Sequence, residues 1–306
     1  MTDYRSGFIA VIGRPNVGKS TLINAMLGQK IAAVSPRPQT TRRRQLGILT
    51  REDAQLIFVD TPGIHQPRHK LGEFLNQEAQ EALDGVDVIL FLVDASAEPA
   101  KDESRIAGLL QKISSRIPIV LVANKMDLVE VGADGRSLLQ ARIEIYQALL
   151  KREAKPIAIS ALRSDHLNDL IALLISLLPV RPPEYDEEQI TDLYEREITA
   201  DLIREAALLK LRDEVPHGIA VRVDEFKERE NGMTYMAATL FVERESQKGI
   251  VIGEGGKMLK QIGTAARKQI EDMGGHRIFL ELRVKVEKDW RNNENMLKRL
   301  GYKIKK

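Results

Sequence analysis

The stretch Gly13-Arg14-Pro15-Asn16-Val17-Gly18-Lys19-Ser20 is a complete G-x-x-x-x-G-K-S phosphate loop, and it decides the fold of the first half of the chain. An apolar run at residues 8–12 precedes the loop. A helix-compatible stretch, Thr21 to Leu27, follows it. A strand, a tight turn and a helix N-terminus in this order point backbone N–H groups at one anion. Lys19 is predicted to neutralise the β- and γ-phosphates of a nucleoside triphosphate, and the Ser20 hydroxyl to bind Mg²⁺.

Length and composition set the outer limits. The chain has 306 residues, about twice the length of a single domain, so two domains are predicted. Cysteine is absent, which excludes disulfides and thiolate metal sites and fits a reducing cytoplasm. The N-terminus lacks the apolar core of a signal peptide, and no apolar run reaches the roughly 18 residues that span a bilayer. A cytoplasmic protein is therefore expected.

The first 180 residues alternate short apolar runs with stretches of helical period. Strands are predicted at residues 8–12, 46–49, 56–60, 86–94, 117–123 and 156–160, and helices at 19–28, 71–83, 102–115, 137–150 and 167–178. The later strands are apolar throughout, as buried parallel strands are. This pattern predicts an α/β P-loop domain with a mostly parallel sheet, whose ligands bind at the carboxyl ends of the strands.

Three further motifs fall at those strand ends. Asp60, Thr61, Pro62 and Gly63 follow one strand, so that a carboxylate can hold Mg²⁺ and a glycine N–H can approach the γ-phosphate. The next motif, at residues 124–127, consists of Asn124, Lys125, Met126 and Asp127 and predicts guanine as the bound base. The Asp127 carboxylate can accept hydrogen bonds from the N1–H and the amino group of guanine. Adenine has an acceptor at N1 and would leave that carboxylate unpaired. The aliphatic stem of Lys125 is expected to cover the purine. Ser160, Ala161 and Leu162 are expected to complete the pocket through their backbone.

These motifs resemble the translation-factor-related class of GTPases. The resemblance implies a Thr in a switch loop before the second strand, and Thr41 is the predicted Mg²⁺ ligand, with Thr40 as the competitor. The predicted catalytic residues are Lys19, Thr41, Gly63 and Asn16. Ile64 stands where Ras-like enzymes carry a water-orienting Gln, so slow intrinsic hydrolysis is predicted. In GTPases with this substitution, the residue matching Asn16 helps bind K⁺, which implies potassium stimulation as a hypothesis.

The second half of the chain begins after a proline-rich break at residues 178–183 and has a different pattern. A helix is predicted at 192–211, strands at 219–226 and 235–243, a helix at 256–273 and a strand at 277–286. Residues 181–246 hold 9 Lys and Arg against 17 Asp and Glu, a balance of −8, whereas 247–306 hold 15 against 7, or +8. This asymmetry suggests a polyanion partner, and solvated surface charge is the alternative.

The stretch Val251-Ile252-Gly253-Glu254-Gly255-Gly256 opens the longer of these helices and resembles the G-x-x-G turn of the K-homology (KH) RNA-binding module. In that module the turn lets the backbone approach about four single-stranded nucleotides. The predicted RNA-binding residues are Gly253, Glu254, Gly255, Gly256, Lys257, Lys260, Arg267 and Lys268, the last four as phosphate-directed charges. A glycine turn before an ordinary amphipathic helix is the alternative.

Taken together, the chain resembles the Era family of bacterial ribosome-biogenesis GTPases, with a GTPase domain at 1–180, a linker at 181–191 and a smaller α+β KH domain of type II at 192–306. The resemblance implies GTP or GDP and Mg²⁺ as ligands. It also implies binding to the single-stranded 3′ end of small-subunit ribosomal RNA, a role in assembling that subunit, a monomeric state and peripheral contact with the inner membrane.

Two other functional classes stay open from the residues. The first is an RNA-binding assembly adaptor whose nucleotide site turns over little, which Ile64 makes conceivable. The second is a nucleoside kinase or ATPase, which the Asn124–Asp127 motif opposes.

Overall fold

The computed structural model describes residues 3–35, 37, 40–129, 133–212, 215–229 and 232–302. The chain divides into two compact units: unit 1 is residues 1–30, 41–66 and 75–192, and unit 2 is residues 31–40, 67–74 and 193–306. No sequence pattern indicated that two early segments group with the C-terminal residues. The domain boundaries predicted from the sequence stay a prediction. The C-terminal residues 303–306, three of which are lysines, lie outside the described residues.

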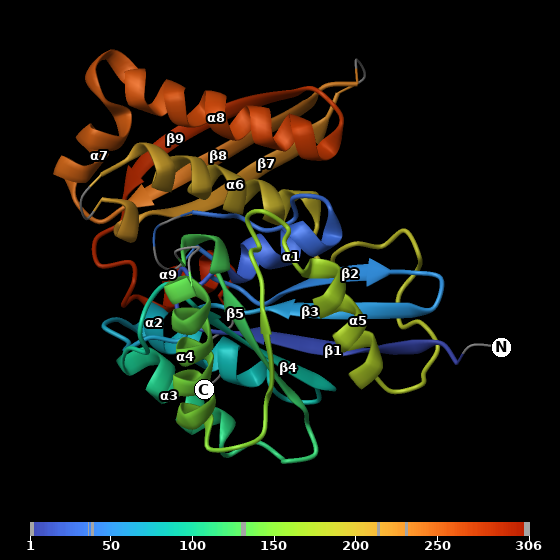
Figure 1. The fold of residues 1–306 in the computed structure, drawn as a ribbon. Coiled ribbons are helices and arrows are strands. Elements are labelled where there is room, and N and C mark those ends of the chain that lie inside the picture. The colour runs from blue at the N-terminus through green and yellow to red at the C-terminus, as the bar shows by residue number, and fades with distance from the viewer. Residues whose placement is uncertain are drawn as a thin grey trace. The chain divides into compact units, whose positions relative to one another are not determined.

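Unit 1 is built on a six-stranded sheet (Figure 1). Its strands are β1 (Arg5–Ile12), β2 (Gln45–Thr50), β3 (Ala54–Asp60), β4 (Val88–Asp94), β5 (Ile119–Asn124) and β6 (Lys155–Ala158), in the order β2-β3-β1-β4-β5-β6. Only β2 runs antiparallel to its neighbour. The predicted α/β fold with a mostly parallel sheet is therefore confirmed.

Helices bury both faces of this sheet, which explains why β3 and β4 are buried at every position. On one face, a single hydrophobic core joins strand residues such as Phe91 and Leu121 to side chains from α2 (Lys70–Glu81), α3 (Lys101–Leu110) and α4 (Ala133–Leu150). The helices α1 (Lys19–Leu27) and α5 (Leu167–Leu177) contact β3. Full burial of each large aliphatic side chain stabilises the fold by about 1.5–3 kcal/mol.

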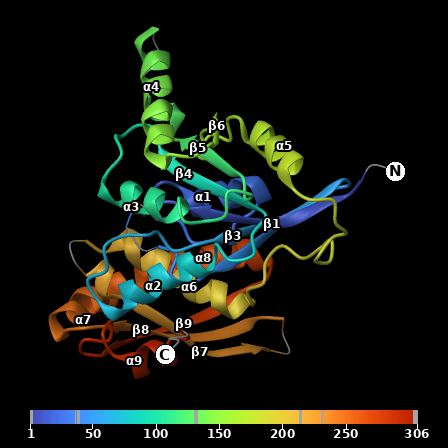
Figure 2. The same ribbon diagram turned by 90° about the horizontal axis from the view of Figure 1, so that it is seen from below.

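Unit 2 contains a three-stranded sheet in the order β7-β8-β9, formed by β7 (Ala220–Glu228), β8 (Thr234–Val242) and β9 (Ile278–Val286). β7 is antiparallel to β8, and β9 is parallel to it. The helices α6 (Glu195–Lys210) and α8 (Lys257–Gly274) contact each other and share one core with the sheet (Figure 2). No helix in the described parts of the chain is long and apolar enough to cross a membrane.

Two short helices of unit 2 were missed by the sequence reading, α7 (Glu245–Ile252) and α9 (Glu294–Arg299). Gly249 and the β-branched residues 250–252 disfavour a helix locally, so propensity gave no signal for α7. Tertiary contacts override that preference, because Val251 is fully buried and the Gln247 side chain accepts hydrogen bonds from the N–H groups of Glu243 and Arg244.

Candidate functional site

The phosphate loop joins β1 to α1 and is held against the ends of β4 and β5. A Cβ atom built on Gly13 would lie 2.4 Å from the carbonyl oxygen of Leu92, and one built on Gly18 would lie 2.4 Å from Nδ2 of Asn124. Gly18 also has a φ of +102°. Only glycine therefore fits either position. Between them, Asn16 is exposed with a φ of +64°, and Val17 is fully buried.

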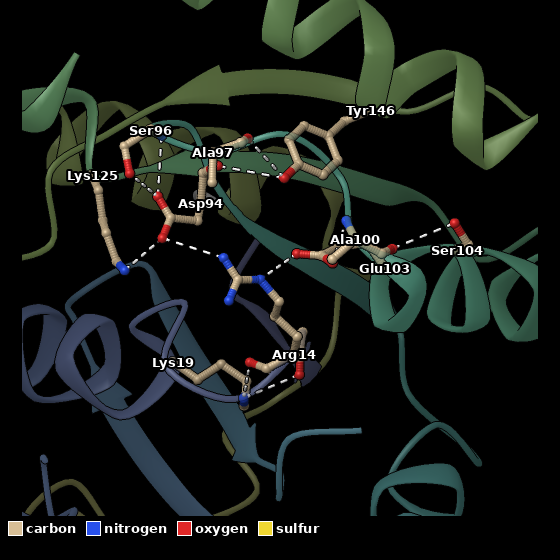
Figure 3. Close-up of polar contacts among 11 residues, drawn as sticks. Arg14, Lys19, Asp94, Ser96, Ala97, Ala100, Glu103, Ser104, Lys125 and Tyr146 are labelled. Carbon is tan, nitrogen blue, oxygen red and sulfur yellow. Dashed lines mark hydrogen bonds and ion pairs between the residues drawn. The ribbon is translucent and has the colours of Figure 1, made fainter. Parts of the chain in front are cut away.

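Lys19 is the first residue of α1, and its ammonium group lies inside the loop (Figure 3). Nζ donates to the carbonyl oxygens of Gly13 at 3.2 Å and Arg14 at 3.1 Å. Burial lowers the pKa of Lys19 to about 8, and the nearby Asp60 carboxylate offsets part of that effect. A bound anionic phosphate would favour the charged form of this lysine.

Three oxygen-bearing side chains converge beside Lys19. The Ser20 hydroxyl lies 2.8 Å from the Thr41 hydroxyl and donates to Oδ2 of Asp60 at 2.9 Å, and the Thr41 hydroxyl lies 3.3 Å from the same oxygen. Burial raises the pKa of Asp60, although Lys19 and the two hydroxyls oppose the rise. Its second oxygen, Oδ1, is buried and has no hydrogen-bond partner among the residues that the structure describes. A buried carboxylate oxygen with two hydroxyls nearby suits the oxygen ligands that Mg²⁺ prefers.

Thr40, the competing candidate for the Mg²⁺ site, is occupied elsewhere. Its hydroxyl donates to the carbonyl oxygen of Arg37 at 2.8 Å. The geometry therefore favours Thr41 over Thr40 as the Mg²⁺ ligand.

The residues after Asp60 lie next to the phosphate loop. A Cβ atom built on Gly63 would lie 2.6 Å from the backbone nitrogen of Pro15, so the two loops touch through their backbones. The Thr61 hydroxyl donates to the carbonyl oxygen of Val11 at 2.7 Å, and Pro62 is buried. Ile64 is 2% exposed and packs in the core with α2, α3 and α4. Its side chain is thus part of the core, which leaves only its backbone for a nucleotide.

The predicted base-binding residues are brought together by Asn124, the last residue of β5. Its Nδ2 donates to the carbonyl oxygen of Val17 at 2.8 Å, and its Oδ1 accepts from the N–H of Ala161 at 2.9 Å. One buried amide therefore ties the phosphate loop to the loop after β6, where the Ser160 hydroxyl accepts from the N–H of Arg163.

Lys125, Met126 and Asp127 form the turn that follows Asn124. Lys125 has a φ of +65°, and Met126 begins a 3-10 turn. The Asp127 carboxylate is only 5% exposed and lies 3.9 Å from Nε of Arg163. Leu162 is 79% exposed, so its side chain is free to cover a ligand. An acceptor-only carboxylate in this setting can pair with a base that presents two N–H donors.

In unit 2, the predicted G-x-x-G turn joins α7 to α8. Gly253, Gly255 and Gly256 have φ values of +70°, +57° and +77°. A Cβ atom built on Gly253 would lie 2.7 Å from Cβ of Met258 and 2.9 Å from its backbone nitrogen. The turn therefore needs glycine for both conformation and space, whereas Glu254 and Lys257 are exposed on it.

A groove of about 420 Å³ lies between α8 and β9. Two of the predicted cations, Lys260 and Arg267, line it together with Gly256, and Lys268 is exposed on α8 without lining it. Sequence reasoning missed the remaining lining residues, which are Leu259, Gly263, Thr264, Phe279, Leu280 and Leu282. For the lining residues on α8, the sequence did offer a signal: they follow Gly256 at intervals of three to four residues, which places them on the same face of the helix. The contribution of β9 had no local signal.

Two side chains at the nucleotide site were also missed. Asp94 is the last residue of β4, just as Asp60 is the last residue of β3. A carboxylate at the end of a fully buried strand could therefore have identified Asp94 as a site residue. Gln45 is buried at the start of β2, and its Nε2 lies 3.4 Å from Oδ2 of Asp60. No pattern around Gln45 distinguished it.

Comparisons with known proteins agree on both units. A family model described as "50S ribosome-binding GTPase" matches residues 8–125, and one described as "KH domain" matches residues 214–291. GTPase Era of Ruminiclostridium cellulolyticum is 48% identical over 304 residues, which cover 99% of each chain.

Two solved structures also match nearly the whole chain, and each is 36% identical to it. Era in complex with MgGDPNP and nucleotides 1506–1542 of 16S ribosomal RNA has a TM-score of 0.91, and the match covers 98% of this chain and 100% of that one. A variant of Aquifex aeolicus Era bound to GDP and AlF4⁻ has a TM-score of 0.89 with the same coverage.

Proposed function

The chain belongs to the Era family of GTPases, and on this premise we propose that it is a GTP-hydrolysing switch that assists assembly of the small ribosomal subunit. It binds the 3′ end of small-subunit ribosomal RNA, as its relative in complex with nucleotides 1506–1542 of 16S ribosomal RNA does, and its KH module is the part that makes this contact. The observation that carries the nucleotide part is Asn124, because one buried amide holds the phosphate loop and the base-binding loops together.

Each residue of the nucleotide site has a proposed task. The Lys19 ammonium neutralises charge on the β- and γ-phosphates, and the Gly63 N–H approaches the γ-phosphate from the loop after β3. Asp127 selects guanine by accepting from two donors on the base edge. Ser20, Thr41 and Asp60 hold Mg²⁺, which neutralises charge that develops on the phosphate oxygens.

The attacking water is oriented by a group other than Ile64, whose side chain lies in the hydrophobic core. Intrinsic hydrolysis is accordingly slow. Asn16 is exposed at the mouth of the phosphate loop, where it can supply an oxygen to K⁺ beside the phosphates. Potassium stimulation therefore belongs to this proposal.

The RNA part rests on the turn at Gly253–Gly256 and on the groove beside it. Glycines at Gly253 and Gly256 let the backbone approach a sugar-phosphate chain closely, and Lys260 and Arg267 place positive charge along the groove. The apolar side chains that line the groove, which include Leu259 and Phe279, suit contact with unpaired bases.

Contacts inside unit 2 support coupling between nucleotide and RNA. The segment 31–40, which precedes Thr41, is bonded to α6: the N–H of Val34 donates to Oε2 of Glu205 at 2.9 Å, and Arg204 donates to the carbonyl oxygen of Thr40. Oε1 of Glu205 accepts from Gln269 of α8 at 3.2 Å. A change of the segment on GTP binding would thus act on the helix that begins at the G-x-x-G turn.

The test is RNA affinity in the two nucleotide states. A short RNA with the sequence of the ribosomal 3′ end should bind with different affinity in the GTP-analogue and GDP forms, and by linkage the RNA should change nucleotide affinity by the same factor. Equal affinities would contradict the switch. Steady-state phosphate release with and without this RNA separates the enzyme from the adaptor, since the adaptor shows no turnover in either condition.

The location of the protein also belongs to the proposal. We infer a cytoplasmic monomer with a peripheral membrane-associated fraction from the family resemblance. Sedimentation equilibrium tests the monomer, and fractionation of cells tests the membrane contact.

A further inference from the structure

Asp94 lies between the two ends of the nucleotide site. It is the last residue of β4, and the sheet register pairs it with Asn124, the last residue of β5. The N–H of the next residue, Ala95, donates to the carbonyl oxygen of Asn124 at 2.8 Å. Parallel strands that end in register bring their terminal side chains to one edge, and so Asp94 stands beside the base-binding turn. It is only 6% exposed.

The two oxygens of this carboxylate serve different partners (Figure 3). Oδ2 accepts from the Lys125 ammonium at 2.7 Å and lies 3.5 Å from the Arg14 guanidinium. Oδ1 accepts from the N–H of Ser96 at 3.1 Å and from its hydroxyl at 2.6 Å. Burial would raise the pKa of Asp94, but the hydrogen bonds from Lys125 and Ser96 outweigh it and lower that pKa, so the carboxylate is charged at neutral pH.

Arg14 extends this connection into the phosphate loop. Its guanidinium donates from Nε to Glu103, a fully buried residue of α3 that also accepts from the N–H of Ala100. The second residue of the phosphate loop and the lysine of the base-binding turn therefore meet at one carboxylate.

We propose that Asp94 is a positioning residue for the guanine nucleotide and acts mainly through Lys125. A free lysine side chain has four rotatable bonds, so its stem would cover a purine only part of the time. Two constraints fix it here: the left-handed backbone of Lys125, with a φ of +65°, and the bond of its ammonium to Asp94. The stem is thereby held in place before the base arrives, which lowers the entropy lost on binding.

This inference rests on the proposed guanine-nucleotide site, and one competing role must be separated from it. Asp94 could act only by shaping the loop after β4 through Ser96. The two roles use different oxygens, so they can be tested separately. Ser96→Ala removes the hydroxyl bond to Oδ1, whereas Lys125→Met removes the ammonium bond to Oδ2 and keeps most of the apolar stem.

The experiment measures dissociation of a fluorescent GDP from the full-length protein by stopped flow. Asp94→Asn should release GDP about tenfold faster, the equivalent of about 1.4 kcal/mol. In a protein that already carries Lys125→Met, adding Asp94→Asn should change the GDP release rate less than about twofold, because the two residues act as one unit. Ser96→Ala should stay within about twofold of wild type. Asp94→Glu keeps the charge and should recover most of the loss.

The outcomes distinguish the proposal from its premise. If the wild-type protein binds no guanine nucleotide, the proposed function fails. If it binds GDP, the positioning role is overturned by an unchanged rate in Asp94→Asn, by full additivity with Lys125→Met, or by an equal effect of Ser96→Ala. Urea unfolding without nucleotide is run on each variant. If Asp94→Asn does not fold, Lys125→Met alone decides: it removes the same ammonium bond and should also speed GDP release, and a rate within about twofold of wild type would overturn the role.

Discussion

Replacing Gly253 by alanine should disable the RNA turn and leave the nucleotide site intact. Gly253 has a φ of +70° and a ψ of +170°, a conformation that is essentially confined to glycine and costs other residues about 1–3 kcal/mol. The new Cβ would lie 2.7 Å from Cβ of Met258, whereas carbon atoms pack at about 3.5–4.0 Å. Relieving such overpacking costs about 1–3 kcal/mol more.

The two costs add to about 2–6 kcal/mol against the native turn, which corresponds to at least a 30-fold loss of RNA affinity when binding requires that turn. Gly255→Ala is the matched control. At the φ of +57° found at Gly255, alanine costs about 1–2 kcal/mol more than glycine, but its Cβ would meet no atom within 4 Å. Gly249→Ala, inside α7 with open space around it, should be neutral or stabilising.

Fluorescence anisotropy with a labelled RNA of the ribosomal 3′ end measures the affinity, and GDP binding by the same variants reports on unit 1. We expect the loss of RNA affinity to rank Gly253→Ala above Gly255→Ala above Gly249→Ala, with GDP affinity unchanged in all three. The steric argument is refuted if Gly253→Ala binds this RNA as wild type does, or if Gly255→Ala is impaired equally.

Three other predictions concern the nucleotide site. Asp127→Asn should weaken GTP binding about 100-fold or more, because two charge-assisted hydrogen bonds to the base are lost, and the variant should prefer XTP to GTP. Competition binding measures both affinities, and an unchanged preference for GTP would contradict the role of Asp127. GTP hydrolysis should be faster in KCl than in NaCl, and Asn16→Ala should abolish the difference; equal wild-type rates would exclude the potassium site. Asp94→Asn should lower the free energy of unfolding at pH 7. Because the folded-state pKa of Asp94 lies below its ordinary 3.8, the difference should shrink below pH 3.8 and be lost as the pH falls through the folded-state pKa. Urea unfolding at several pH values checks this.

Much of the nucleotide site could be predicted because its motifs are local. The strand β1, the glycine turn and the N-terminus of α1 follow one another directly along the chain between Arg5 and Ser20, so adjacent sequence already specifies the loop. Thr41 and Thr40, by contrast, are neighbours with the same hydroxyl, and only the direction of each side chain separates them. The Thr41 hydroxyl lies within hydrogen-bond distance of Asp60, whereas the Thr40 hydroxyl donates to the carbonyl oxygen of Arg37, so the structure places only Thr41 beside the proposed Mg²⁺ ligands.

Asp94 and Gln45 escaped the sequence reading for a different reason. Each is a single polar residue at a strand end, and the partners that connect it to the nucleotide site are distant in the chain: Asp94 contacts Arg14 80 positions away and Lys125 31 positions away. The groove between α8 and β9 could be predicted only in part. Its α8 residues follow a helical period, whereas Phe279 of β9 had no local pattern to mark it.

The sequence by itself determined the α/β class, the phosphate loop, the Asn124–Asp127 motif after a strand and the G-x-x-G turn, because each depends on periodicity or on backbone conformations within a few residues. Only the tertiary structure decided which side chains complete those sites. Strand order set Asp94 beside Asn124, and the packing of unit 2 bonded Val34 to Glu205 across 171 positions. Such contacts depend on how distant elements pack, and no local pattern encodes them.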